Sequence, residues 1–533
     1  MDPVRDLVAR NVVPGARIFL TKKPNEHPSM LTAIHQTLLW QRLPDPVGFG
    51  DLHSVERVDA FLVPRTDTPP TLEADDTRSF LHAGETKEWS LWVKEEIALP
   101  GPLPPIGRIP VWQEFAGFLP LLMVLACGAY AAGTGGAVGA VSLLSILLFA
   151  SLSLPIPFTR MTVLAVSALT CIITFSLNKR YRKVGQGICA VVQPTVKRYR
   201  IGMAVALFIL LSALALTHTF LPPNGLAVVG GKAKLLALCN GFPSGFFTSA
   251  DWKSLEPAYP PGLASLLAGC YAISGGCGEW CTQIIGCAAM SFLLFTLLKR
   301  TRAAGGGFWF AALFLPQLCL EIGSSLYPDP FLAILVVAGW QRVSEKEADW
   351  LGWFLIGSSG WFKNEGIVYL LAAWLSLRAT KGPKAAPLPH LLAALTVPLA
   401  WQIGCRIMGA TLNDYAPLYS PDLRKLWAVC LDMVKYCFTK PWEYAFAYPI
   451  LIVSLILFLS KKSRRSAFAR MIPVSLLTAF SLLAFAWLYA CSLAADFRWH
   501  LETGLTRLLW IPALLIVYEF LILPKSPALE NKG

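Results

Sequence analysis

Charged residues are scarce in this sequence of 533 residues, and acidic residues are the scarcer kind. Asp, Glu, Lys and Arg together make up 15% of the chain, against roughly 25% in soluble domains. Hydrophobic residues make up 55% of it, and the mean hydropathy is +0.53. This composition excludes an ordinary soluble protein and predicts an all-α polytopic membrane protein.

Nucleic-acid-binding motifs are absent as well, although the formal net charge is +13. The basic residues gather in short clusters directly after apolar runs, which is the pattern of loops that stay in the cytoplasm. The clearest cluster, residues 178–200, is rich in Lys and Arg and contains no acidic residue. We therefore expect the membrane as a partner and no nucleic-acid partner.

Residues 1–112 contain no apolar segment of the kind found in a signal peptide. They are polar and Pro-rich, and the alternation in AFLVPR and EWSLWVKEEIAL is typical of strands. We expect a small polar N-terminal region with a β-rich module. A second ligand pair is missing beside Cys277 and Cys281, so we expect helix-end packing or a local disulfide there and no metal site.

The positive-inside pattern predicts how the later apolar runs cross the membrane. The run at 201–220 is long enough to cross a bilayer and leads into a polar loop at 222–259. If the Gly-rich run at 261–277 lies on the surface, all three later basic clusters fall in the cytoplasm. We then expect the 222–259 loop on the outer face and about ten core spans.

About two or three additional spans are expected before this core, from the apolar runs at 116–133, 137–156 and 161–177. Three crossings would place residues 1–112 outside. Either the 116–156 pair crosses once or re-enters, or the N-terminal region is translocated. The expected division of the chain is 1–112, 113–200 with the extra helices and basic loop, 201–523 with the core, and a cytoplasmic tail at 524–533.

Two of the core runs, WLGWFLIGSSGWF and GIVYLLAAWLSL, are shorter than a bilayer is thick. Fusing them into one helix would bury Lys363 and Glu365 in hydrocarbon. Irregular backbone at membrane depth is tolerated where protein or water satisfies it. We therefore predict a hairpin of two short helices beside a cavity.

Acidic, basic and aromatic polar residues recur at the ends of the apolar runs that this topology places outside. Charged residues at helix ends are often only solvated termini or snorkelling anchors. Here acid and base occur together on several non-adjacent helices, as a polar cavity requires. The candidates are Lys232, Lys234, Asp251, Glu256, Tyr259, Glu321, Tyr327, Asp329, Lys363, Glu365, Arg498, His500 and Arg507.

Each anion-binding candidate has a structural alternative. Lys232 and Lys234 would contact a phosphate near the membrane or would snorkel from an interfacial helix. Asp329 stands where a helix begins, which favours an N-cap. Arg498, His500 and Arg507 are the strongest candidates, because an Arg within a span needs a partner and a phosphate fits its geometry.

Three short motifs, together with the long outer loop after the first core span, resemble the C-type (GT-C) integral-membrane glycosyltransferases. They are AYPPG at 258–262, YPD at 327–329 and FKNEG at 362–366. The closing HLETGLTRLLWIPALL at 500–515 resembles the last-span region of bacterial members. That superfamily includes protein O-mannosyltransferases and the bacterial aminoarabinose transferase of lipid A. The resemblance covers about 201–523 and implies a GT-C-like helical bundle with a long first outer loop.

The resemblance also implies a polyprenyl-phosphate-linked sugar as donor, transfer with inversion, and an acidic base early in the first outer loop. At the position where such members often have Asp, this chain has Asn224, which cannot accept a proton at neutral pH. Glu256 and Asp251 are the carboxylates that would replace it, although Asp251 beside Trp252 also fits an N-cap.

The sequence is compatible with three functions. The first is a glycosyltransferase of the cytoplasmic (inner) membrane that transfers the sugar to a glycan, lipid or protein acceptor on the outer face. The second is a non-catalytic relative that binds a lipid-linked glycan or a partner, as Asn224 suggests. The third is a transporter or flippase of such lipids, for which the sequence has no visible internal repeat.

Overall fold

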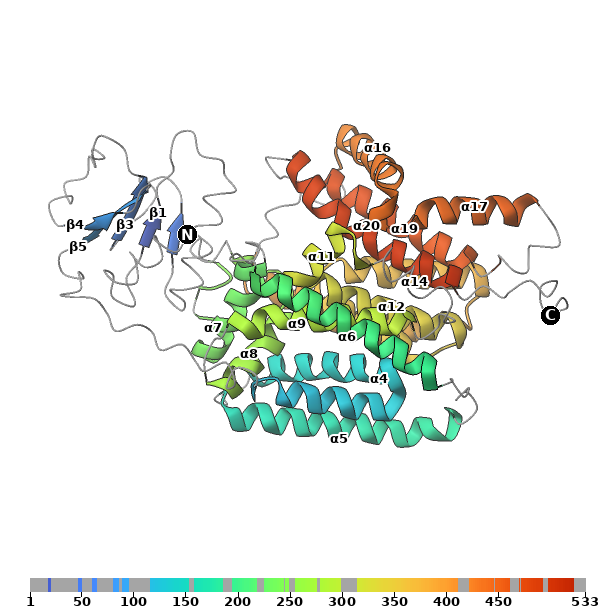
Figure 1. Ribbon diagram of the computed structural model, residues 1–533, viewed down its shortest axis with the longest axis horizontal. Helices are drawn as coiled ribbons and strands as arrows, with labels where there is room; N and C mark the ends of the chain where they lie inside the picture. Colours follow the sequence, from blue (N-terminus) through green and yellow to red (C-terminus); the bar gives the residue numbers. More distant parts are fainter. Residues whose placement is uncertain are drawn as a thin grey trace.

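The structure is a computed structural model, and its strands and helices are drawn in Figure 1. It describes residues 18–20, 47–49, 60–64, 80–85, 89–94, 116–152, 158–185, 194–217, 225–243, 245–248, 255–275, 279–298, 314–410, 421–444, 446–460, 469, 471–491 and 497–521.

The N-terminal region contains a five-stranded mixed sheet. Its strands are β1 Ile18–Leu20, β2 Val47–Phe49, β3 Ala60–Pro64, β4 Phe80–Glu85 and β5 Trp89–Lys94, in the order β2-β1-β3-β5-β4. β1 pairs in parallel with β2 and β3, whereas β5 pairs antiparallel with β3 and β4. The two segments with strand-like alternation, AFLVPR and EWSLWVKEEIAL, each contain one of these strands.

From residue 116 onward the described chain is helical. The helices are α4 Leu119–Leu152, α5 Arg160–Gly185, α6 Pro194–Thr217, α7 Lys232–Cys239, α8 Gly262–Ser274, α9 Glu279–Leu298, α11 Gln317–Ser324, α12 Asp329–Glu345, α13 Trp350–Phe362, α14 Gly366–Lys381, α15 Leu388–Ile407, α16 Leu423–Thr439, α17 Ala447–Ser460, α19 Met471–Ala490 and α20 Phe497–Leu521. A π-helical turn precedes α7 at Gly225–Gly231, and a 3-10 turn, η7, spans Pro441–Tyr444.

Five of the helices in the described ranges are long and apolar enough to cross a membrane. They are Thr134–Leu152, Arg160–Leu177, Leu388–Ile407, Met471–Ala490 and Gly504–Leu521. The chain is therefore a helical, multi-pass membrane protein. The larger number of spans expected from the sequence rests in part on shorter apolar helices, such as residues 284–298 of α9 and 447–459 of α17.

The first apolar stretch of the helical region folds back on itself. Within α4, a Cβ added at Gly128 would lie 2.4 Å from the carbonyl oxygen of Gly136. Eight residues of straight helix would separate these positions by about 12 Å. Leu119–Ala131 therefore packs against the helix that begins at Thr134, and glycine is needed at the contact. This short first arm fits the alternative in which the 116–156 pair re-enters or crosses once.

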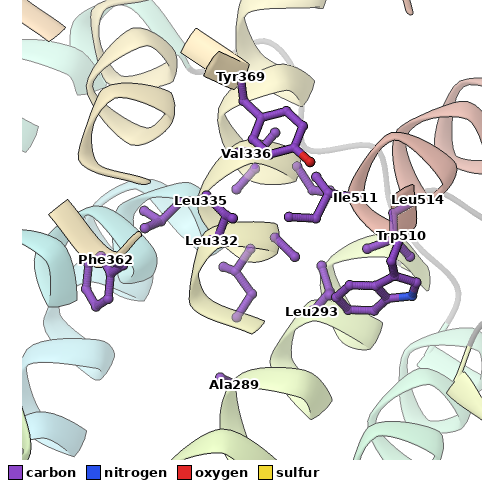
Figure 2. Packing of buried hydrophobic residues seen from close by; sticks show 14 of the residues in the cluster. Ala289, Leu293, Leu332, Leu335, Val336, Phe362, Tyr369, Trp510, Ile511 and Leu514 are labelled. Atoms are coloured by element: carbon purple, nitrogen blue, oxygen red, sulfur yellow. The ribbon is translucent and has the colours of Figure 1, made fainter. Parts of the chain in front are cut away.

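Helix α12 lies at the centre of the bundle. Of its 17 residues, 13 are buried, and its side chains meet those of α9, α13, α14 and α20 (Figure 2). In Figure 2, Leu332, Leu335 and Val336 lie among the labelled side chains of these neighbouring helices. A helix that is apolar on all sides must be surrounded in this way.

Two interruptions between consecutive helices lie at the same end of α12. Helices α11 and α12 form a bent pair at 105°, which makes a corner at residues 325–328. Helices α13 and α14 are separate, with a turn at 363–365, as the two short apolar runs predicted. At the opposite end of α12, Arg342 pairs with Asp349 at 2.8 Å. The corner and the turn therefore face each other across the start of the central helix.

Candidate functional site

A buried carboxylate at the start of α12 anchors the site. The side chain of Asp329 is fully buried, and its Oδ1 accepts a hydrogen bond of 2.9 Å from Lys363 Nζ. Its Oδ2 lies 3.4 Å from Nη1 of Arg507 on α20. A buried charge needs a partner because desolvation is costly, and Asp329 has two.

The α13–α14 turn brings a second carboxylate to the same cations. Lys363 Nζ lies 3.3 Å from Glu365 Oε1, so the lysine stands between two acids. The turn closes tightly: a Cβ on Gly366 would lie 2.2 Å from the backbone nitrogen of Gly360 and 2.3 Å from the carbonyl carbon of Ser359. Only glycine fits there, and this close approach fixes the positions of Lys363 and Glu365 in the turn between α13 and α14.

Arg507 also contacts an aromatic ring from the α11–α12 corner. Its guanidinium carbon is 4.4 Å from the ring centroid of Tyr327. Arginine is favoured in such stacked sites because its planar, weakly hydrated cation interacts with both a ring face and a carboxylate. Arg507 is thus held by the YPD corner through both Tyr327 and Asp329.

The segment at 255–259 lies beside this charged cluster, and Lys232 holds its backbone in place. This lysine is fully buried, and its Nζ donates to the backbone oxygens of Glu256 at 2.6 Å and Tyr259 at 2.7 Å. Trp401 Nε1 donates 3.0 Å to the oxygen of Ala258. Glu256 has a positive φ of 47°, and its side chain is exposed. The two braces hold a strained turn in which Glu256 is exposed.

The electrostatics of this wall follow from burial and nearby charge. Burial lowers the pKa of the Lys232 amine to about 7, and the negative charge of Glu256 opposes the shift. Burial, followed by the charges of Glu365 and Asp329, raises the pKa of Tyr259 well above its ordinary value. The Tyr259 hydroxyl therefore keeps its proton at neutral pH and can donate a hydrogen bond.

The structure thus brings together residues that the sequence placed on one side of the membrane. They come from α7, the 255–259 turn, the α11–α12 corner, the α13–α14 turn and α20, and they are Lys232, Glu256, Tyr259, Tyr327, Asp329, Lys363, Glu365 and Arg507. Lys234, two residues after Lys232 on α7, is half-buried. Asn224, Asp251 and Cys277 lie outside the described residues, as do the side chains of Cys281, Arg498 and His500.

Three expectations about individual residues change. Asp329 is not an N-cap: Pro328 occupies that position and no side chain caps the helix, because the carboxylate is directed at two cations. Lys232 neither snorkels nor faces outward, since its amine is buried against two carbonyl oxygens. Arg507 has a protein carboxylate as its partner.

Sequence reasoning missed a supporting layer on α15. Gln402 Nε2 donates to Asn364 Oδ1 at 2.6 Å, which ties the α13–α14 turn to α15, and Trp401 holds the 255–259 turn. Both lie in the run 388–408, which reads only as a span. A polar residue beside a tryptophan within such a run is the signal that would have marked them.

An apolar cavity of about 450 Å³ opens beside this layer. Its lining includes Phe149, Phe242, Phe246 and Phe247. The ring centroid of Phe247 lies 6.2 Å from that of Trp401, so the Trp401 side chain lies between this lining residue and the 255–259 turn that it holds. The site is therefore amphiphilic, with charges on one side and aromatic rings on the other.

Lys232 provides a direct test of this arrangement. Lys232→Met should destabilise the protein by about 1–3 kcal/mol, because two buried carbonyl oxygens lose their donor. The midpoint of heat denaturation of the purified protein in detergent measures the loss. Lys234→Met on the same short helix is the control and should cost clearly less, because Lys234 is only half-buried. Equal losses would show that Lys232 does not brace the turn.

Within the described ranges, no group of three or more His, Cys, Asp or Glu side chains is placed to hold a metal ion. Comparison of the chain with protein-family models, with curated proteins and with solved structures gave no match.

Proposed function

We propose that this chain is a membrane glycosyltransferase that moves a sugar from a polyprenyl-phosphate-linked donor to an acceptor on the outer face of the cytoplasmic membrane. The observation that carries the proposal is the cluster around Asp329, where two cations, two acids and two tyrosines from non-adjacent helices meet at one end of the bundle. Sugar transfer from a phosphate needs a base at the acceptor and cations at the leaving group.

In the proposed reaction, Glu256 accepts the proton of an acceptor hydroxyl, and that oxygen attacks the anomeric carbon of the donor. The bond between this carbon and the phosphate oxygen breaks, its electron pair stays on the lipid phosphate, and the configuration inverts. Arg507 and Lys363 stabilise the new phosphate charge. Arg507 keeps further N–H donors beyond its 3.4 Å contact with Asp329, and a guanidinium can bind a phosphate through such donors.

The apolar cavity supports an amphiphilic donor. Its aromatic lining adjoins Trp401, which itself holds the turn that presents Glu256. A polyprenyl phosphate has an apolar chain and a charged head, and the site offers a surface for each. The acceptor would be a glycan, a lipid or a protein.

A second candidate, binding without turnover, is favoured by the balance of charge. Asp329 and Glu365 neutralise Lys363 and Arg507 within the protein. A site whose cations are already paired attracts a phosphate less strongly than one with excess positive charge. In this case the chain binds a lipid-linked glycan or a partner and does not consume the donor.

The two candidates differ in one measurement. The purified protein is placed in vesicles with a panel of polyprenyl-phosphate monosaccharides and a membrane lipid extract as acceptor, and release of polyprenyl phosphate is followed. We expect release from at least one donor, reduced in Arg507→Met. Binding of a donor without release would support the second candidate, and neither binding nor release would contradict both.

A further inference from the structure

Helix α16 has three distinct faces. One face packs against α19, α20 and η7 through the buried residues Val429, Met433 and Cys437. A second face carries the polar residues Arg424, Lys425, Asp432 and Lys435. Between them runs a stripe of large apolar side chains at helical spacing, Leu423, Trp427, Leu431, Val434 and Phe438.

This stripe is exposed along its whole length. Leu423 is 71% exposed and Trp427 68%, and Trp442 in the turn that follows is 58% exposed. At 100° per residue the stripe occupies an arc of about 80° between the packed face and the charged face, with Arg424 and Lys435 at its edge. One side of α16 therefore faces the protein, one side is apolar and exposed, and one side is charged. Such a helix fits a place where protein, lipid and water meet.

Both ends of α16 are tied to ends of membrane-crossing or apolar helices. The backbone nitrogen of Asp422 donates 3.0 Å to the oxygen of Ala490, the last residue of the candidate span α19. At the other end, η7 leads directly into the apolar helix α17. The helix therefore begins beside the end of a candidate span and ends beside the start of an apolar helix, and Figure 1 draws it inclined to α17.

The same contacts place α16 at the end of the bundle that holds the charged cluster. Tyr444 in η7 donates 3.5 Å to the oxygen of Thr506, and Tyr448 at the start of α17 donates 2.7 Å to the oxygen of Leu509. These two acceptors flank Arg507 on α20. The start of α17 and the site residue are thus level along the bundle.

We infer that α16 is an interfacial helix that lies in the bilayer surface beside the charged site, with its apolar stripe inserted among the lipid acyl chains. The bilayer is the occupant that the geometry favours, because α16 packs on the candidate span α19 and begins at the last residue of that span. Trp427 and Trp442 suit the headgroup level, where tryptophan is enriched. Arg424 and Lys435 flank the stripe and reach phospholipid headgroups.

Site-specific photocrosslinking tests the inference on the full chain. Benzoylphenylalanine replaces Trp427 or Val434 in the stripe, and the protein is reconstituted into vesicles of phosphatidylethanolamine and phosphatidylglycerol. After irradiation, mass spectrometry detects any added phospholipid. We expect several-fold more lipid adduct from these positions than from Lys435, the exposed neighbour of Val434 on the polar face.

The same crosslinking also tests whether a protein, and not lipid, covers the apolar stripe of α16. Crosslinks from position 427 to another copy of the chain in vesicles, or to another protein in native membranes, in preference to lipid would overturn the inference. Equal lipid adduct from positions 434 and 435 would overturn it as well, because the stripe would then have no defined orientation. Trp427 is exposed, and an aromatic substitute there keeps the packed face intact.

Discussion

Replacing Asp329 with asparagine is expected to destabilise the protein by about 3–5 kcal/mol, the usual cost of breaking a buried ion pair from one side. Asn keeps the shape of the side chain and removes only the charge. Lys363, whose side chain is 6% exposed, then faces Glu365 alone, and Arg507 loses its carboxylate. The heat-denaturation midpoint of the purified protein in detergent should fall accordingly.

The other ion pair at an end of α12 is the matched control. Arg342 and Asp349 pair at 2.8 Å, but the arginine is 29% exposed. Asp349 also caps α13 by accepting from the Gly352 nitrogen, a role that Asn can fill. Asp349→Asn should therefore cost about 1 kcal/mol or less. If both variants lose the same stability, the Asp329 pair is not a buried anchor.

A double variant separates loss of the pair from a general defect. In Asp329→Asn with Lys363→Met, the unpaired ammonium is removed together with its carboxylate. Part of the stability should return, because replacing both members of a buried pair costs much less than replacing one. A double variant that is as unstable as the sum of the two single variants would show that the two side chains do not interact.

The hairpin at 363–365 and the helical character of the chain could be predicted because both depend on local composition. The two apolar runs are each too short to cross alone, and the charged FKNEG turn between them cannot lie in hydrocarbon. The structure places helix ends at Phe362 and Gly366. By the same local reasoning, residues 261–277 read as one apolar run, and the structure has α8 at Gly262–Ser274.

Partners that are distant in sequence could not be predicted. Asp329 stands at a helix start, and local rules therefore favoured an N-cap, but its partners are 34 and 178 residues away. Arg507 was expected to need an external anion because no acid lies near it on its own apolar run. The 105° corner before α12 supplies the carboxylate instead, and such a corner has no local sequence signal beyond its proline.

The burial of Lys232 could not be predicted from the local sequence either. A lysine at the edge of an apolar segment usually keeps its charge in water. Here the 255–259 turn lies over it and offers two carbonyl oxygens, so the amine is fully buried. The turn is rigid because Trp401 holds it from α15, and this contact joins positions 143 residues apart. Charge patterning indicated which residues share a side, and the fold decided which of them touch.

If the chain is a transferase, Glu256→Gln should lower its turnover by about 10²–10⁴-fold, the usual contribution of a general base. The amide cannot accept a proton, yet it keeps the size and polarity of the side chain. Expression and donor binding should change little, because the side chain is exposed and the backbone oxygen of Glu256, which Lys232 binds, is retained. Release of polyprenyl phosphate in vesicles, at a saturating donor concentration, measures the effect.

Two further variants assign the base within the loop. Asp251→Asn should lower turnover much less, since Asp251 is favoured as a helix cap and Glu256 stands on the turn that Lys232 and Trp401 hold beside Tyr259. Full activity in Glu256→Gln with loss in Asp251→Asn would transfer the role to Asp251. If instead Asn224→Asp produced activity in a silent natural chain, the protein would be a binding relative whose base was lost at Asn224. The braced turn would then serve recognition, because Lys232 and Trp401 fix the position of Glu256 whether or not its carboxylate takes a proton.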